Sequence, residues 1–164
     1  MKLTTKMALA GHIDALVLMS PNFGPRHPLA GLLQYPWLQP AAVRLIRGWR
    51  RFPAVNAGHA AVWTLDYPRI AVLPMLNLVH AVGRIDPGRI RIPVLIFYHP
   101  ADLVVRVDRM RRFYNRLGSR EKQRFRIDRS HHPGTHILAG DVFAPAMTRP
   151  VSDLASAFIQ ETVV

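Results

Sequence analysis

Two residues that could work together as an acid and a base follow two apolar segments of the sequence. Asp102 comes directly after the run 92–98, and His136 lies in the loop 131–141, which follows a second expected strand over 123–128. A short run of apolar, β-branched and aromatic residues bounded by proline is typical of a strand buried on both faces of a parallel sheet. Open α/β sheets place their chemistry at the carboxyl ends of such strands. The spacing therefore predicts that Asp102 orients the His136 imidazole and stabilises its charged form, as in a Ser–His–Asp relay.

Each member of this pair has rivals of the same type nearby. His131 and His132 precede His136 in the same loop, Asp108 falls within an expected helix, and Asp128 ends an expected strand. A single aspartate after a strand is also a common helix N-cap. The residue types alone therefore leave the choice of acid and histidine open.

The residues around the pair resemble the C-terminal half of an α/β-hydrolase, closest to the serine-aminopeptidase and lysophospholipase-like branch. The resemblance rests on the sequences PVLI at 93–96, PAD at 100–102 and THILAGD at 135–141, and it also takes in residues 16–25 and 63–68. It implies that Asp102 and His136, rather than their rivals, are the acid and the histidine. It further implies hydrolysis of a small-molecule ester or amide, with no cofactor and no metal.

The third member of a triad is missing from the sequence. In α/β-hydrolases the chain order is Ser, Asp, His, with the serine in a G-x-S-x-G turn, and no such motif occurs in the 164 residues. Ser20 follows an expected strand, but it has no flanking glycines of that pattern and is expected to be a structural loop residue. We expect a truncated chain whose missing part lies at the N-terminus and which is inactive alone.

The expected fold is α/β, a partial α/β-hydrolase with a mostly parallel sheet, flanking helices and a helical cap insertion. Residues 1–26 would form a core helix and strand, 27–84 the cap, and 85–164 the C-terminal core that carries the acid and the histidine. Hydrophobic periodicity and proline positions predict the following elements: helices over 3–10 (ending at Gly11), 41–51, 67–82, 106–117 and 150–163, and strands over 13–19, 92–98 and 123–128.

Four residues are candidates for lining a substrate pocket, each with ordinary packing or loop structure as the alternative. Asn22 and Phe23 follow the first expected strand, at the same edge of the sheet as the pair. Trp63 and Tyr67 belong to a set of aromatic residues in the cap that could form an apolar acyl pocket.

Composition narrows the remaining classes of function. The chain has no cysteine, so disulfides and thiolate metal sites are excluded, and a reducing cytoplasmic location is expected. The net charge of +12 is compatible with nucleic-acid binding, but the arginines are spread out without a recognition motif, so no nucleic acid is expected as a partner. No apolar run is long enough to span a membrane. The alternatives to a hydrolase are a non-catalytic interaction module, which would pair with a separate N-terminal half or with itself, and, less favoured, a basic nucleic-acid-binding protein.

Overall fold

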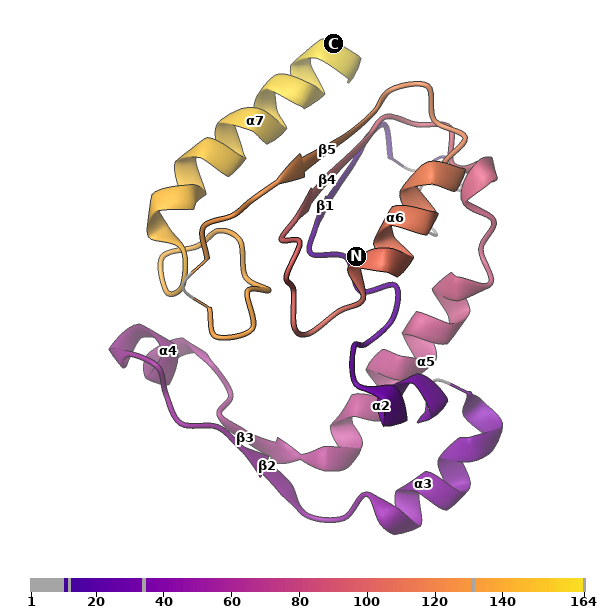
Figure 1. The fold of residues 1–164 in the computed structure, drawn as a ribbon, viewed down its shortest axis with the longest axis vertical. Helices are drawn as coiled ribbons and strands as arrows, with labels where there is room; N and C mark the ends of the chain where they lie inside the picture. The colour runs from indigo at the N-terminus through magenta and orange to yellow at the C-terminus, as the bar shows by residue number, and fades with distance from the viewer. Residues whose placement is uncertain (1–10, 12, 34, 131, 164) are drawn as a thin grey trace.

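The computed structural model describes residues 11, 13–33, 35–130 and 132–163, so the helix expected over 3–10 lies outside the described residues. Figure 1 shows a small sheet between two helices, with a separate group of short elements to one side. The elements in chain order are β1 (Leu16–Met19), α2 (Pro28–Leu33), α3 (Gln39–Leu45), β2 (Trp49–Arg51), α4 (Ala57–Val62), β3 (Asp66–Pro68), α5 (Val72–Gly83), β4 (Val94–Tyr98), α6 (Val107–Arg116), β5 (Lys122–Arg126) and α7 (Pro145–Val163).

The sheet that carries the expected strands has three parallel strands in the order β1-β4-β5. Leu16 pairs with Val94, and Val94 in turn pairs with Lys122. The central strand β4 is almost entirely buried, whereas β5 is mostly exposed. Phe125 and, just beyond the strand, Ile127 turn inward between exposed charged residues. The fully apolar run 92–98 and the alternating run 123–128 therefore mark the centre and an edge of the sheet, as their patterns predict.

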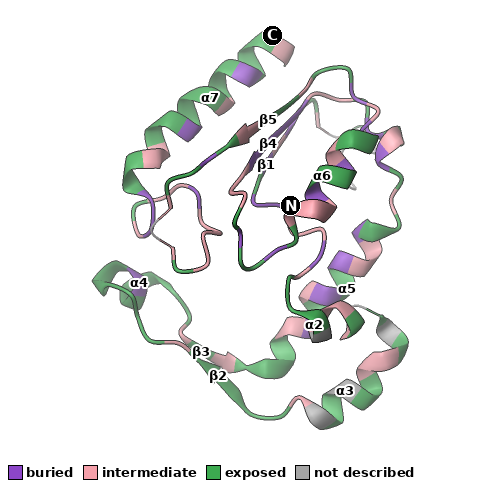
Figure 2. Cartoon of the chain, in the orientation of Figure 1, coloured by how far each residue is buried: buried purple, intermediate pink, exposed green. Residues whose placement is uncertain are grey.

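Successive residues of β4 face opposite layers of the core. Val94 and Ile96 pack with Met110 and Phe113 of α6. Leu95 and Phe97 pack in a second cluster with Val151 and Phe158 of α7. Helices thus cover both faces of the sheet, and Figure 2 shows their buried sides turned toward it. This is the parallel sheet with flanking helices that the sequence predicts.

Residues 27–84, inserted between β1 and β4, are not purely helical. A short antiparallel pair joins β2 to β3, with Arg50 opposite Tyr67. Two predictions are corrected here. The helix expected over 41–51 ends at Leu45, because the turn at Gly48 has a positive φ of 85° and the chain then enters β2. The helix expected over 67–82 begins only at Val72, because a residue before proline, here Tyr67 before Pro68, favours extended backbone.

The last helix also begins earlier than expected. The pattern placed its start at Pro150, but α7 begins at Pro145, and Pro150 lies inside the helix. Proline is favoured in the first turn of a helix. Both Pro145 and Pro150 could therefore begin this helix, and the sequence alone does not distinguish between the two starts. Within the described part of the chain, no helix is both long enough and apolar enough to cross a membrane.

Candidate active site

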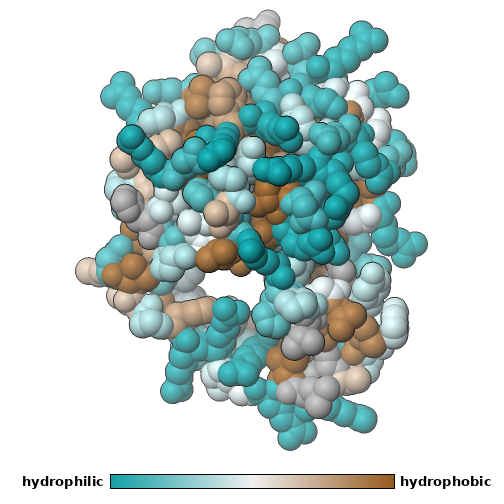
Figure 3. Space-filling model, viewed as in Figure 1, coloured by the Kyte–Doolittle hydropathy of each residue, from teal (hydrophilic) through white to brown (hydrophobic). Residues whose placement is uncertain are grey.

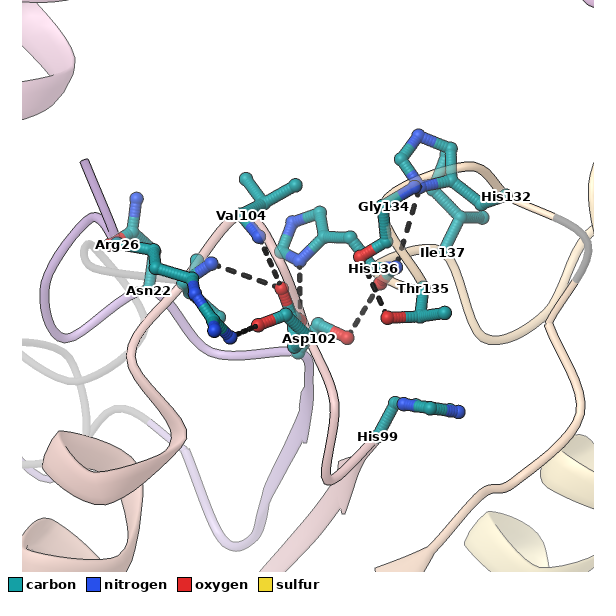
Figure 4. A network of polar contacts seen from close by, with 12 residues as sticks. Asn22, Arg26, His99, Asp102, Val104, His132, Gly134, Thr135, His136 and Ile137 are labelled. Atoms are coloured by element: carbon teal, nitrogen blue, oxygen red, sulfur yellow. Dashed lines mark hydrogen bonds and ion pairs between the residues drawn. The ribbon is translucent and has the colours of Figure 1, made fainter.

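The loops that follow β4 and β5 bring the predicted acid and histidine into contact. The Nδ1 atom of His136 lies 2.8 Å from Oδ2 of Asp102. The Asp102 side chain is 2% exposed and that of His136 is 27% exposed, so the pair is open to solvent only on the histidine side. A carboxylate accepts hydrogen bonds and does not donate them, so Nδ1 carries the proton and the neutral ring keeps its lone pair on Nε2. Figure 4 shows the free nitrogen of the ring turned away from Asp102.

The chain after β4 fixes the Asp102 carboxylate in place. Its Oδ1 atom accepts hydrogen bonds from the backbone N–H groups of Val104 at 2.8 Å and Val105 at 3.0 Å. The carbonyl of Asp102 accepts a bond from Nη1 of Arg26 at 2.8 Å. With His136 bonded to Oδ2, both carboxylate oxygens have hydrogen-bond partners, which buried polar groups require. The acid can hold the imidazole in one orientation.

The histidine loop is fastened to the acid loop by its own backbone. The N–H of Leu103 donates to the carbonyl of Gly134 at 2.9 Å, and the Thr135 hydroxyl donates to the carbonyl of Ala101 at 2.6 Å. Thr135 has a positive φ of 49°. Left-handed backbone is uncommon outside glycine and often marks functional turns. Here it turns the chain directly before His136.

Ser20 lies at the same edge of the sheet, but its hydroxyl is directed at the backbone of His136. It donates a 2.6 Å hydrogen bond to the His136 carbonyl. The residue is 7% exposed and has a φ of 41°. A nucleophile would need its hydroxyl within reach of the base. This serine instead connects β1 to the histidine loop.

His132, one of the two rival histidines, shapes the loop rather than contacting the acid. Its Nδ1 accepts the backbone N–H of Gly134 at 3.1 Å and, more weakly, that of His136 at 3.4 Å. Its ring lies edge-on to Phe143, with centroids 4.9 Å apart. Burial lowers the pKa of His132, and the nearby His136 lowers it further. The other rival, His131, lies outside the described residues.

An aromatic cluster joins α4 to this loop. Phe143 is buried and has three edge-on neighbours, namely His59, Trp63 and His132. The Asn56 side chain, which caps α4, also donates to the carbonyl of Val142 at 2.9 Å. One end of the inserted segment is therefore attached beside the histidine loop.

The four residues predicted to line a pocket have different surroundings. Trp63 reaches the histidine loop through Phe143. Phe23 stacks on Phe113 with centroids 4.0 Å apart and packs on the core. Tyr67 packs against Phe52 in the β2–β3 region. The Asn22 side chain contacts the Met75 sulfur and accepts the N–H of Gly24.

Several residues that build the site were not predicted from the sequence. Arg26 and Phe143 belong to no motif, and Thr135 is part of the run 135–141 without a role assigned to it there. The contacts of all three depend on loops that are distant in sequence. The His132 contact could have been anticipated, because a ring nitrogen that accepts an N–H two residues later imitates an Asx turn. Among the described residues, no three His, Asp or Glu side chains gather to hold a metal ion.

No protein-family profile matches the sequence, and no curated protein does. Solved structures do match, and three of them are of lipolytic enzymes. One, described with the metagenome-derived lipolytic enzymes LipS and LipT, is 20% identical with a TM-score of 0.65, and the match covers 98% of this chain and 61% of that one. The monoacylglycerol lipase of Paleococcus ferrophilus is 13% identical with a TM-score of 0.61, covering 97% and 64%. A soluble variant of monoglyceride lipase from Saccharomyces cerevisiae, in complex with a substrate analog, is 11% identical with a TM-score of 0.60, covering 99% and 62%.

This chain thus spans a little over three fifths of the length of the structures that it matches. The match extends over nearly all of its residues and includes the parallel sheet, the flanking helices and the inserted segment. The chain has an α/β-hydrolase-like fold.

Proposed function

We propose that Asp102 and His136 are the acid and the histidine of an acyl-hydrolase site. The observation that carries the proposal is the 2.8 Å contact between His136 Nδ1 and the buried carboxylate of Asp102. The two residues follow neighbouring parallel strands at their carboxyl ends, where this class of fold places its chemistry.

In the proposed reaction, Nε2 of His136 accepts the proton of an attacking hydroxyl group and later returns it to the leaving group. Asp102 keeps the ring in the required tautomer and stabilises the imidazolium that forms. The hydrogen bonds from Val104 and Val105 hold the acid during both steps. In α/β-hydrolases, two backbone N–H groups stabilise the oxyanion. One belongs to the residue after the nucleophile, and the other belongs to an earlier loop.

The nucleophile itself is proposed to lie outside these 164 residues. The sequence has no G-x-S-x-G motif, and the Ser20 hydroxyl is engaged with the carbonyl of His136 rather than with its ring. We infer that the chain alone hydrolyses esters poorly or not at all. A segment carrying the nucleophile would have to be supplied by a longer chain or by a separate one.

The proposed substrate is a small-molecule ester of the kind that lipolytic enzymes cleave. The three solved structures support this class, since they are of a lipolytic enzyme, a monoacylglycerol lipase and a monoglyceride lipase. We assign residues 27–84 as the cap of the site. Trp63 and His59 of this cap pack against Phe143 beside the histidine loop.

A first experiment asks whether the chain contains its own nucleophile. The purified chain would be treated with a fluorophosphonate probe, and any adduct would be mapped by mass spectrometry beside a His136→Ala variant. We expect no adduct. An adduct at Ser20 that disappears in the variant would contradict an external nucleophile.

A second experiment supplies the missing serine. An N-terminal segment of an α/β-hydrolase that contains the G-x-S-x-G turn would be fused ahead of residue 1, and hydrolysis of a p-nitrophenyl ester measured. We expect activity that falls by about 10³-fold or more with either His136→Ala or Asp102→Asn. His80→Ala is the matched control, because this histidine packs on Tyr35 in the cap. A folded, active fusion that is unaffected by His136→Ala would refute the assignment.

A further inference from the structure

A cavity of about 680 Å³ lies between α2 and the first turns of α6. Its walls come from the loop after β1, from α2 and from the start of α6. Among the described residues, the lining includes neither Asp102 nor His136. A volume of this size is within the range of small-molecule sites, which run from about 300 to 1,000 Å³.

The lining of this cavity is strongly basic. Four arginines face a single carboxylate, that of Asp108, which leaves an excess of three positive charges. Figure 3 shows hydrophilic side chains gathered over the region of α6. Arginine guanidinium groups bind phosphate in a bidentate manner, with two parallel N–H donors.

Contacts with the protein position three of these arginines in advance of any ligand. Arg26 donates to the carbonyl of Asp102, and Arg106 makes two hydrogen bonds to Asp108, at 3.0 and 2.7 Å. Arg109 lies so close to Gly24 that a Cβ atom there would come within 2.6 Å of its Cδ. Groups held in place before binding lose less entropy when a ligand arrives.

The two loops that carry the arginines are also joined to one another. The N–H of Arg26 donates to the carbonyl of Val104 at 3.0 Å, and the N–H of Arg106 donates to the carbonyl of Gly24 at 2.9 Å. Pro25 and Val105 form an antiparallel bridge between these bonds. Backbone hydrogen bonds therefore join the two loops that form the basic wall of the cavity.

Asp108 reduces the positive charge without cancelling it. Its carboxylate is shared between Arg106 and Arg112, both at 2.7 Å. Hydrogen bonding by Arg106 holds the pKa of Asp108 well below its usual range. The residue is thus an anion at neutral pH, and it competes with any bound anion for Arg106.

The opposite wall is apolar and open to solvent. Leu32 is 55% exposed and Tyr35 is 39% exposed, and Pro28 lies in the same wall. These side chains would add nothing to the binding free energy of a fully hydrated ion. A short hydrocarbon chain would instead bury their apolar surface, which is favourable. We propose that the cavity binds a small organic phosphate with a short apolar part. The cavity shares Arg26 and Val105 with the residues that hold Asp102, but its test needs no catalytic activity.

The test is calorimetric titration of the full chain with three probes: hexyl phosphate, inorganic phosphate and hexanol. We expect hexyl phosphate to bind saturably at one site, inorganic phosphate to bind several-fold more weakly, and hexanol not to bind. Equal affinities for hexyl phosphate and inorganic phosphate would overturn the amphiphilic assignment, and the absence of saturable binding by either would overturn the site.

Variants separate this site from the general basicity of the chain. Arg111→Gln should weaken hexyl phosphate binding, and Arg26→Gln with Arg111→Gln should weaken it by about tenfold or more, because each substitution removes a guanidinium group that can bind the phosphate. Asp108→Asn should strengthen it, because Arg106 gains freedom to bind the ligand. Arg149→Gln removes one positive charge, as Arg111→Gln does, but from α7, where the side chain is 91% exposed, and should leave binding unchanged. Equal effects of Arg149→Gln and Arg111→Gln, each checked for native circular dichroism, would refute the proposal.

Discussion

At the scale of single residues, the Asp102 carboxylate has three hydrogen-bond donors around it: His136 and two backbone N–H groups. Asparagine has one acceptor oxygen where aspartate has two. In Asp102→Asn an NH2 group therefore faces one of these donors, and that hydrogen bond is lost. A buried hydrogen bond to a charged group is worth about 1.5–3 kcal/mol. We expect Asp102→Asn to lower the free energy of unfolding in urea by that amount. The matched control is Asp128→Asn, whose side chain is 58% exposed beside Arg126 and should cost no more than about 1 kcal/mol. Equal losses would contradict the structural role of the acid.

His132 gives a residue-scale prediction about pH. Burial and His136 lower its pKa in the folded chain, Asp102 opposes them and His59 adds to them. The unfolded chain therefore binds a proton at this position more readily than the folded chain does. Stability contributed by neutral His132 is present above a pH of about 6.5 and is lost as the pH falls below it.

The variant His132→Asn should make the stability of the chain less sensitive to pH between about 7 and 5. An asparagine oxygen can still accept the N–H of Gly134, as in an Asx turn, but it does not titrate. The measurement is the free energy of unfolding as a function of pH, with His27→Asn as control, because His27 is exposed. An unchanged pH dependence in His132→Asn would contradict the prediction.

At the scale of elements, α7 contributes the second layer of the core. Phe158 is 2% exposed and packs with Leu95 and Phe97 of β4, whereas its neighbour Ile159 is 40% exposed. Truncating a buried aromatic side chain costs about 3–5 kcal/mol. We expect Phe158→Ala to lower the thermal unfolding midpoint strongly and Ile159→Ala to lower it little. Similar shifts for the two variants would mean that α7 is not packed as described.

The elements also show which helices and strands hydrophobic patterns can predict and which they cannot. The central and edge strands, and the helix that becomes α6, follow from hydrophobic periodicity, because each buries a regular face. The pattern fails in the inserted segment, where it extended a helix through Gly48 and into β2. There the strands have three residues each and are mostly exposed, so their pairing depends on backbone bonds that leave no hydrophobic repeat.

At the scale of the whole molecule, the positions of Asp102 and His136 at the carboxyl ends of adjacent strands could be derived from strand order. The residues that support them could not. Arg26 and Ser20 reach the site from the loop after β1, far away in sequence, and no local pattern encodes such contacts. The basic cavity is a further example: its arginines look like an ordinary solvated helix face until the loop after β1 is placed beside them.

The pairing of Leu16 with Val94 has a consequence for the order in which the chain assembles. The whole inserted segment lies between these two residues, whereas β4 and β5 are linked through α6 alone. Short loops close at lower entropic cost than long ones, so the unit β4–α6–β5, and with it the contact between Asp102 and His136, is expected to form before β1 joins. The bond from Ser20 to the His136 carbonyl would then be among the last to form. Because each doubling of a loop costs only about 0.6 kcal/mol, evolution can lengthen or shorten the inserted segment without giving up the sheet.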